Sequence, residues 1–136
     1  MPVSYFINHE KKRLYTRATG TVTFIDLREH MHSEFGRATA TYTELFDCTG
    51  ATADLDTDDM RMLVKERSQI AQVQDPAPVA IVAPTDSFFD LFRIFDSLTT
   101  SIRPIAVFRE VSEAEQWLDQ FRLDSGTVLA VEDNSR

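Results

Sequence analysis

The sequence predicts an α/β fold built on a mostly parallel sheet. Along its 136 residues, short runs of β-branched and aromatic residues alternate with longer amphipathic stretches, in the order β-β-α-β-α-β-α-β-α. Two of the later short runs, "PVAIVA" and "IAVF", are continuously apolar, as strands are when helices cover both of their faces. This alternation implies right-handed crossovers between parallel strands, and an N-terminal hairpin supplies one antiparallel edge strand.

The hairpin and the first helix come from the first 38 residues. "VSYFIN" and "RLYTRAT", separated by the charged "HEKK", predict two strands over about residues 3–19, and we expect Gly20 to break the second strand. The apolar residues of "TVTFIDLREHMHSEFGRA" recur at three- and four-residue steps, which predicts a helix. Thr23 and Asp26 at its start have the spacing of a capping box.

The remaining elements follow in alternation. "ELFDC" predicts a short third strand, and a second helix is expected from Thr57, as its N-cap, to about Gln74. "PVAIVA" then predicts a central parallel strand, "DSFFDLFRIFDSLTTSI" a helix and "IAVF" another buried strand. "SEAEQWLDQF" predicts the last helix, which opens with Ser112 and Glu115 as a capping box.

Length and composition favour one soluble domain over residues 1–121, with a mobile C-terminal tail over residues 122–136. The net charge of −8 opposes binding to nucleic acid, whose phosphates require clustered basic residues. No apolar run approaches the length of a membrane span, and the start of the chain lacks the pattern of a signal peptide. The lone Cys48 agrees with a reducing compartment, so we expect a cytoplasmic location.

The acidic stretch "TADLDTDDM" is the first candidate for chemistry. Its acids at 54, 56 and 58 satisfy the D-x-D-x-D start of a calcium loop. However, Asp59 occupies the position that needs glycine, and Lys65 occupies the position of the closing glutamate, so we expect no metal. Helix chemistry explains Asp58 and Asp59, because carboxylates in a first turn interact favourably with the helix dipole. Asp54 and Asp56 are then solvated loop acids.

Other candidates for catalysis are isolated in the sequence. His30 and His32 lie about 200° apart on their helix, so they cannot converge on one metal and are expected to be solvated. Arg67 interrupts an apolar helical stripe, where it forms a structural ion pair, reaches solvent at an edge or contacts a ligand. We expect no enzyme and no cofactor, and Asp47, Cys48 and Arg67 are the first residues to test for one.

A phenylalanine-rich cluster lies on the third predicted helix. Its members are Phe88, Phe89, Phe92, Ile94 and Phe95. Phe88, Leu91, Phe92, Phe95 and Leu98 share a core stripe, whereas Phe89 and Ile94 lie on its opposite flanks and widen the apolar face. The face is that of a deeply packed helix, or it lines a pocket for a small apolar ligand, or it forms a homodimer contact.

Several segments together resemble the STAS or SpoIIAA-like fold, and more narrowly the stand-alone SpoIIAA-like family of small bacterial proteins. They are "ATGTVTFIDLREHM", "LFDCTGATADLDTDDMRML", "VAIVAPTDSFFDLFRIF" and "IAVFREVSEAEQWL". The resemblance spans roughly residues 3–121 and depends on the order of these segments, because no single motif is diagnostic.

The resemblance implies a phosphorylation switch, of which this sequence carries part of the motif. In anti-sigma-factor antagonists of this fold, an apolar strand leads through Asp, a small residue and Gly to an Asp-Ser-Ser/Thr-Gly turn whose hydroxyl is phosphorylated. Asp47 and Gly50 fit that pattern, and Asp56 with Thr57 matches the start of the turn. Carboxylates at 58 and 59 replace the next hydroxyl and glycine, and a fixed charge cannot be switched. Thr57 is therefore the candidate phosphosite.

The resemblance also implies a recognition surface where the parallel strands end and the next helices begin. The residues expected there are Thr21, Thr49, Asp54, Asp56, Thr57, Asp58, Thr85, Asp86 and Ser87. This set contains carboxylates and no Lys or Arg side chain, which favours a basic protein partner. We therefore predict a non-catalytic regulatory or protein-binding module. The alternative is a carrier of a lipid or acyl chain held beside the Phe-rich helix.

Overall fold

Within the described residues, five strands form one sheet in the order β1-β2-β3-β4-β5. A computed structural model describes residues 3–35, 42–71, 77–99 and 104–125. The strands are β1 (Val3–Asn8), β2 (Arg13–Thr23), β3 (Thr43–Asp54), β4 (Val79–Val82) and β5 (Ile105–Phe108). β1 pairs antiparallel with β2, and every other neighbouring pair is parallel. The predicted α/β fold with one antiparallel edge strand is confirmed.

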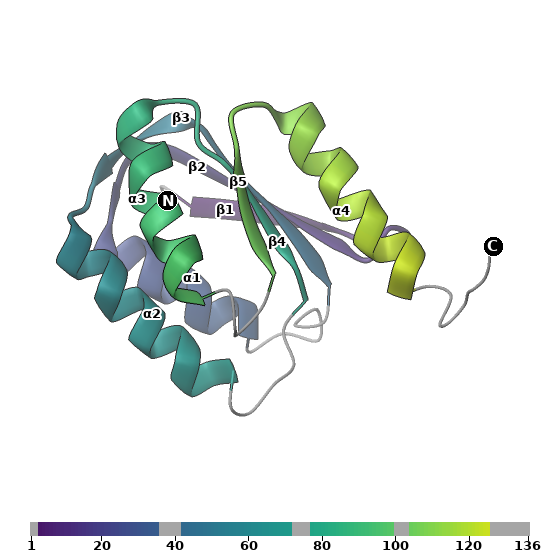
Figure 1. The fold of residues 1–136 in the computed structure, drawn as a ribbon, viewed down its shortest axis with the longest axis horizontal. Coiled ribbons are helices and arrows are strands. Elements are labelled where there is room, and N and C mark those ends of the chain that lie inside the picture. Colours follow the sequence, from purple (N-terminus) through teal and green to yellow (C-terminus); the bar gives the residue numbers. More distant parts are fainter. Residues whose placement is uncertain (1–2, 36–41, 72–76, 100–103, 126–136) are drawn as a thin grey trace.

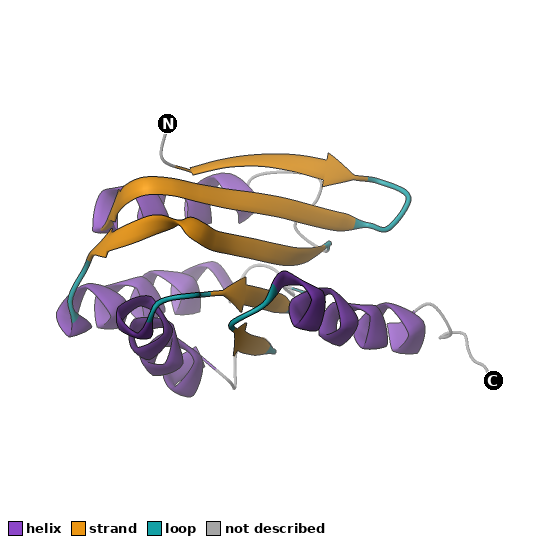
Figure 2. Ribbon diagram, turned by 90° about the horizontal axis from the view of Figure 1, so that it is seen from above, coloured by secondary structure: helices purple, strands orange, loops and turns teal. Residues whose placement is uncertain are grey.

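The helices pack on the two faces of the sheet unequally. They are α1 (Phe24–Phe35), α2 (Thr57–Ala71), α3 (Asp86–Thr99) and α4 (Val111–Ser125). Of the described helices, α1, α2 and α3 lie on one face and α4 lies on the other (Figures 1 and 2). The larger part of the core lies between the sheet and the first three helices, and a smaller part lies under α4. All of β4 is buried because both of its faces are covered.

Two strands are longer than the sequence indicates. β2 continues through Gly20, whose φ of 69° falls in the left-handed region that glycine adopts at little cost, so the predicted break there is wrong. The register between β2 and β3 shifts between Arg17 and Thr19, and pairing then resumes as far as Thr23 opposite Asp54. β3 therefore extends well beyond the "ELFDC" segment, and β2 and β3 project together past the end of β4.

Helix boundaries agree with the predictions at one cap and differ at another. The Thr23–Asp26 capping box is confirmed, since the Thr23 N–H donates to Asp26 Oδ2 (2.9 Å) and the Asp26 N–H donates to Thr23 Oγ1 (3.3 Å). The box predicted for Ser112 and Glu115 is wrong, because α4 begins at Val111 and Glu115 turns to other partners. α4 also runs to residue 125, beyond the predicted boundary at 121, and the rest of the predicted tail lies outside the described residues.

Candidate functional site

The starts of the helices lie at the edge where the parallel strands end, which runs from the left side to the top of Figure 1. We call this edge the acidic edge, after the carboxylates in the first turns of its helices. α2 has Asp58 and Asp59 in its first turn, α3 has Asp86 and α4 has Glu113. Each carboxylate interacts favourably with the positive end of its own helix dipole, so the fold itself favours acids here.

The turn from β3 into α2 holds its carboxylates in two different ways. The Asp56 N–H donates to Asp59 Oδ2 (3.0 Å), and the Asp59 N–H donates to Asp56 Oδ1 (2.8 Å). This reciprocal pair makes Asp56 the N-cap of α2. The prediction that Thr57 is the N-cap is therefore wrong. The prediction that Asp56 is only a solvated loop acid is wrong too. Thr57 is the first helical residue and is half-buried. Asp58 is 86% exposed and pairs with Arg61 at 3.1 Å.

The predicted surface residues on β2 and β3 lie along strands, not in loops. Asp54 is the last residue of β3, exposed and opposite Thr23, which corrects its prediction as a loop acid. Thr21 is exposed on β2, and Thr49 is exposed on β3. The Thr49 N–H donates to Asp47 Oδ1 (2.9 Å). These positions line the projecting β2–β3 pair.

The start of α3 carries the second group of predicted residues. Thr85 caps the helix by accepting from the Phe88 N–H at 3.3 Å. Asp86 is 88% exposed and accepts from Arg109 at 2.8 Å, while Ser87 is exposed beside it. Arg109 follows β5 and also donates to the Pro84 carbonyl. The nine residues expected at this edge include no cation, but Arg109 and Arg61 also lie there, paired with Asp86 and Asp58. No hydrogen bond or ion pair between described residues joins the 85–87 group to the 54–58 group.

A buried polar cluster, which the sequence did not predict, lies under α1. His30 Nε2 is 2.7 Å from Glu44 Oε2, and the Thr16 hydroxyl donates to the same oxygen at 2.6 Å. His30 and Glu44 are both buried, so the prediction of a solvated His30 is wrong. His32, in contrast, is exposed and lies 2.7 Å from Glu66. A buried carboxylate is stabilised by such hydrogen bonds, and the cluster fixes α1 against the sheet.

A small cavity adjoins this cluster. Its volume is about 40 Å³, and its lining includes His30, Glu44, Arg67, Phe92 and Phe95. Arg67 is buried and lies 5.8 Å from the centre of the Phe95 ring, so it does not reach solvent at an edge. Ligand pockets usually enclose about 300–1,000 Å³, so this space suits a few water molecules and not an acyl chain.

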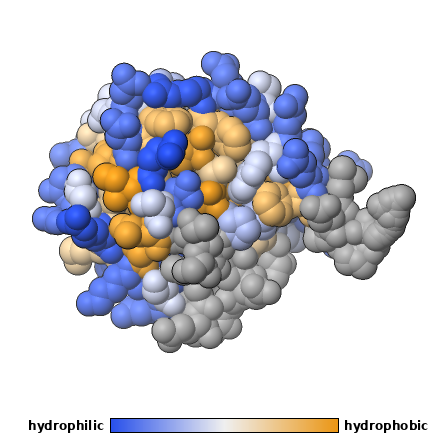
Figure 3. All heavy atoms as spheres, in the orientation of Figure 1, coloured by the Kyte–Doolittle hydropathy of each residue, from blue (hydrophilic) through white to orange (hydrophobic). Residues whose placement is uncertain are grey.

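The Phe-rich helix is largely a packed core element. Phe88, Phe92 and Phe95 are buried, whereas Phe89 and Ile94 are half-buried. The Phe89 ring is partly covered by Arg109, which lies 4.2 Å from its centre. On the face drawn in Figure 3, apolar atoms gather over α3 and beside α2, with hydrophilic residues around them. The predicted core stripe is confirmed at its three phenylalanines and is wrong at Leu98, which is 47% exposed, while Leu91 is half-buried. The flanking residues Phe89 and Ile94 line a partly exposed apolar surface.

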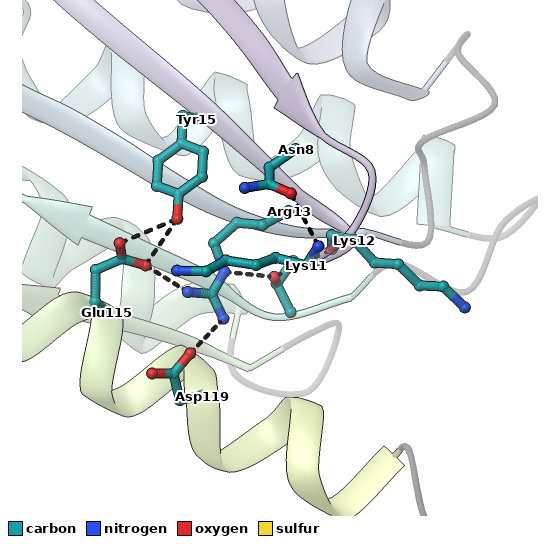
Figure 4. A network of polar contacts seen from close by, with 8 residues as sticks. Asn8, Lys11, Lys12, Arg13, Tyr15, Glu115 and Asp119 are labelled. Carbon is teal, nitrogen blue, oxygen red and sulfur yellow. Dashed lines mark hydrogen bonds and ion pairs between the residues drawn. The ribbon is translucent and has the colours of Figure 1, made fainter.

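A second polar network connects α4 to the sheet (Figure 4). Arg13 has no exposed surface and forms ion pairs with Glu115 and with Asp119, the latter at 3.0 Å. The Tyr15 hydroxyl also donates to Glu115 at 3.0 Å. Burial acts to lower the pKa of Arg13, but the hydrogen bonds to Glu115 and Asp119 raise it overall. The network therefore holds a charged guanidinium between β2 and α4.

The residues named for a test of catalysis are not brought together. Asp47 lies on the α4 side of the sheet, where it pairs with Arg17 at 3.5 Å, while Cys48 is buried in the core on the other side. Burial, with the nearby charges of Asp47 and Glu44, raises the pKa of Cys48, so its thiolate is scarce at neutral pH. Within the described residues, no group of three or more His, Cys, Asp and Glu side chains could hold a metal ion.

Comparison with solved structures identifies the fold. No protein-family model matches the sequence, and no curated protein matches it either. Among solved structures, the chain is similar to the crystal structure of an uncharacterised protein of the DUF3478 family, with a SpoIIAA-like fold, from Shewanella loihica PV-4. The TM-score is 0.57 at 20% identity, over 85% of this chain and 93% of the other. The fold is SpoIIAA-like.

The resemblance inferred from the sequence is thus confirmed at the level of fold. At 20% identity the likeness to this SpoIIAA-like structure concerns the fold alone. A further structural finding is that no helix in the described ranges is long and apolar enough to cross a membrane.

Proposed function

We propose that the chain is a non-catalytic, protein-binding regulatory module that recognises a basic partner through its acidic edge. The observation that carries this proposal is the placement of exposed carboxylates at the starts of successive helices along one edge of the sheet. Open α/β sheets bind their ligands at this edge, where loops and helix N-termini converge. A partner with clustered Lys and Arg side chains complements the charge.

The two arginines at the acidic edge leave its carboxylates available to bind a partner. Arg61 is 64% exposed in its pair with Asp58, and Arg109 is 44% exposed in its pair with Asp86. Exposed ion pairs contribute only about 0–1 kcal/mol, so a partner's cation can replace either arginine at small cost. Asp56 and Asp59 have a different role, since their side chains cap α2.

The proposal is tested with two matched double variants. Asp58→Asn with Asp86→Asn removes two exposed carboxylates from the acidic edge, and Glu10→Gln with Glu29→Gln removes the same charge from exposed positions elsewhere. A partner is first captured from lysate at low salt, identified, purified and then titrated by calorimetry. We expect the edge variant to bind about three- to tenfold more weakly, with a shallower salt dependence, and the control to bind as the unmodified chain does.

Two outcomes would contradict this function. One is equal affinity of both double variants for the partner. The other is binding of the unmodified chain that does not weaken as salt is raised, because contacts between exposed charges are screened by ions.

Regulation through Thr57 is part of the proposal. A phosphate on this first residue of α2 would meet the helix dipole favourably but would lie next to Asp56 and Asp58. The phosphate would add negative charge to the acidic edge, and this charge would strengthen binding of a basic partner. Peptide mass spectrometry of protein isolated from its own cells should find phosphate on Thr57, and Thr57→Ala should remove it. Unmodified Thr57 under all growth conditions would rule this regulation out.

The alternative of an apolar-ligand carrier is not favoured. It stays a prediction that requires α3 to move, since the cavity beside Phe92 and Phe95 measures only about 40 Å³. A cytoplasmic location likewise remains a prediction.

A further inference from the structure

The two edges of the described sheet differ in how they are covered. β5 is a short edge strand of four residues, and α3 and α4 both pack against it. β1 is an edge strand of six residues, and no strand of the described ranges lies along its outer side (Figure 2). The outer row of β1 backbone N–H and C=O groups is therefore able to pair with another strand.

β1 also lacks the features that usually prevent such pairing. Its sequence, "VSYFIN", contains no charged residue and no proline, and all six residues pair with β2 in unbroken register. Natural edge strands are normally protected by Lys, by Pro or by a bulge. Two large side chains are instead exposed along it, Tyr5 at 46% and Phe6 at 64%. The combination is that of a strand suited to pairing with another strand.

We propose that β1 pairs antiparallel with β1 of a second copy of this chain, which joins the two sheets across a two-fold axis. Because side chains alternate between faces, residues that lie opposite each other must come from the same face of each copy. The two-fold axis then passes between one residue of β1 and the same residue of the second copy. An axis at Tyr5 places Ser4 opposite the partner's Phe6 and Val3 opposite the partner's Ile7.

This register fits the side chains around β1. The Phe6 ring stacks on Tyr15 with 4.9 Å between ring centres, on the side of the sheet that carries α4. An open groove of about 370 Å³ lies there, lined among others by Ser4, Phe6, Leu45 and Val111. Ser4 is small and exposed, so it leaves room for the partner's Phe6 at the mouth of the groove.

Charge permits a second copy at β1 and does not favour a basic partner there. The chain carries a net charge of −8, so two copies repel each other over most of their surfaces. Pairing through β1 brings no like charges opposite each other, because neither strand has any. The nearest charged neighbour in the register is Arg17, opposite Ser4, and it is paired with Asp47. A basic partner, in contrast, is attracted to the acidic edge and not to this uncharged strand.

The inference is tested by sedimentation of the full chain over a concentration range of roughly three orders of magnitude. A strand pair of this length is a small interface, so we expect a reversible, concentration-dependent dimer. Ser4→Lys places one new charge from each copy at the interface without removing a buried side chain. We expect it to weaken dimerisation at least tenfold, while far-UV circular dichroism stays unchanged.

Two matched variants distinguish β1 from other surfaces. Gln116→Lys makes the same charge change on an exposed position of α4 and should leave the dimer intact. Met62→Lys places a charge at an exposed apolar position of α2 and should also leave it intact. A monomer at every concentration would overturn the proposal. So would a dimer that Met62→Lys disrupts and Ser4→Lys does not.

Hydrogen exchange gives a readout that folding defects do not imitate. Backbone amides of Val3–Asn8 should exchange more slowly as the protein concentration rises, because pairing protects the outward-facing N–H groups. The concentration dependence should disappear in Ser4→Lys. Exchange in β1 that is independent of concentration would contradict the proposal even if a dimer were present.

Discussion

Arg13 offers the sharpest test of how buried charge stabilises this fold. Its side chain is fully buried, whereas its partners Glu115 and Asp119 retain exposures of 30% and 53%. Removing the carboxylates leaves a guanidinium that water cannot reach. Removing the guanidinium leaves carboxylates that water can hydrate. The two changes break the same ion pairs, so the structure predicts that their costs differ.

The magnitudes follow from this asymmetry. Removing a partner so that a buried charge is left uncompensated costs about 3–5 kcal/mol, which we expect for Glu115→Leu combined with Asp119→Leu. Arg13→Met keeps much of the side-chain volume and should cost about 1–2 kcal/mol, since the carboxylates regain water. Adding Arg13→Met to the double variant should therefore restore about 2 kcal/mol. At this chain length, each kcal/mol corresponds to about 3–5 °C in the midpoint of thermal unfolding.

Urea unfolding followed by the fluorescence of Trp117, the single tryptophan of the chain, measures these free energies. Gln116→Leu is the control on α4, because Gln116 is exposed and lies between the tested positions of the network. It should change the free energy of unfolding by less than about 0.5 kcal/mol. The reasoning is refuted if the double carboxylate variant falls within 1 kcal/mol of this control, or if Arg13→Met makes it less stable still.

Two further predictions concern the cap of α2 and the buried thiol. Asp56→Ala should lower the free energy of unfolding by about 1 kcal/mol and Thr57→Ala by less than about 0.5 kcal/mol, and equal losses in urea unfolding would contradict Asp56 as the N-cap. Cys48 should react with a thiol reagent at least about 100-fold more slowly in the native protein than in urea, because it is buried and its pKa is raised. Since only the unfolded chain releases this proton near pH 9, stability should fall as the pH rises above that value, and Cys48→Ala should reduce the fall.

Local sequence patterns were sufficient for the element order. The helix period and the apolar runs depend on neighbours in sequence, so the helices and the buried strand β4 could be predicted from them. The lengths of β2 and β3 depend instead on each other. "TGTVT" and "TGATAD" are rich in small and polar residues and read as loops, yet they pair across the sheet as strand extensions. Nothing within either segment indicates its partner.

The polar contacts were missed for the same physical reason. His30 and Glu44 lie on different elements, and Arg13 meets Glu115 from the far end of the chain. A charged residue in an amphipathic pattern is usually solvated, and only the packing of distant elements shows that these are not. One signal was available for Arg13, because strand alternation places it on the same face as Tyr15 and next to the buried Leu14.

The acidic edge and the β1 contact together predict the stoichiometry of a complex. An axis perpendicular to the sheet reverses the strand direction between the two copies, so their acidic edges point toward opposite ends of the joined sheet. In the proposed dimer, neither edge is covered by the β1 contact, so each would be free to bind one molecule of the proposed partner. Sedimentation of the dimer with excess monomeric partner should therefore give a complex of two chains and two partners. Ser4→Lys should give one chain with one partner at the same affinity per site, because the proposed partner binds the acidic edge and not β1. A dimer that binds only one partner molecule, or a loss of partner affinity in Ser4→Lys, would show that the two surfaces overlap.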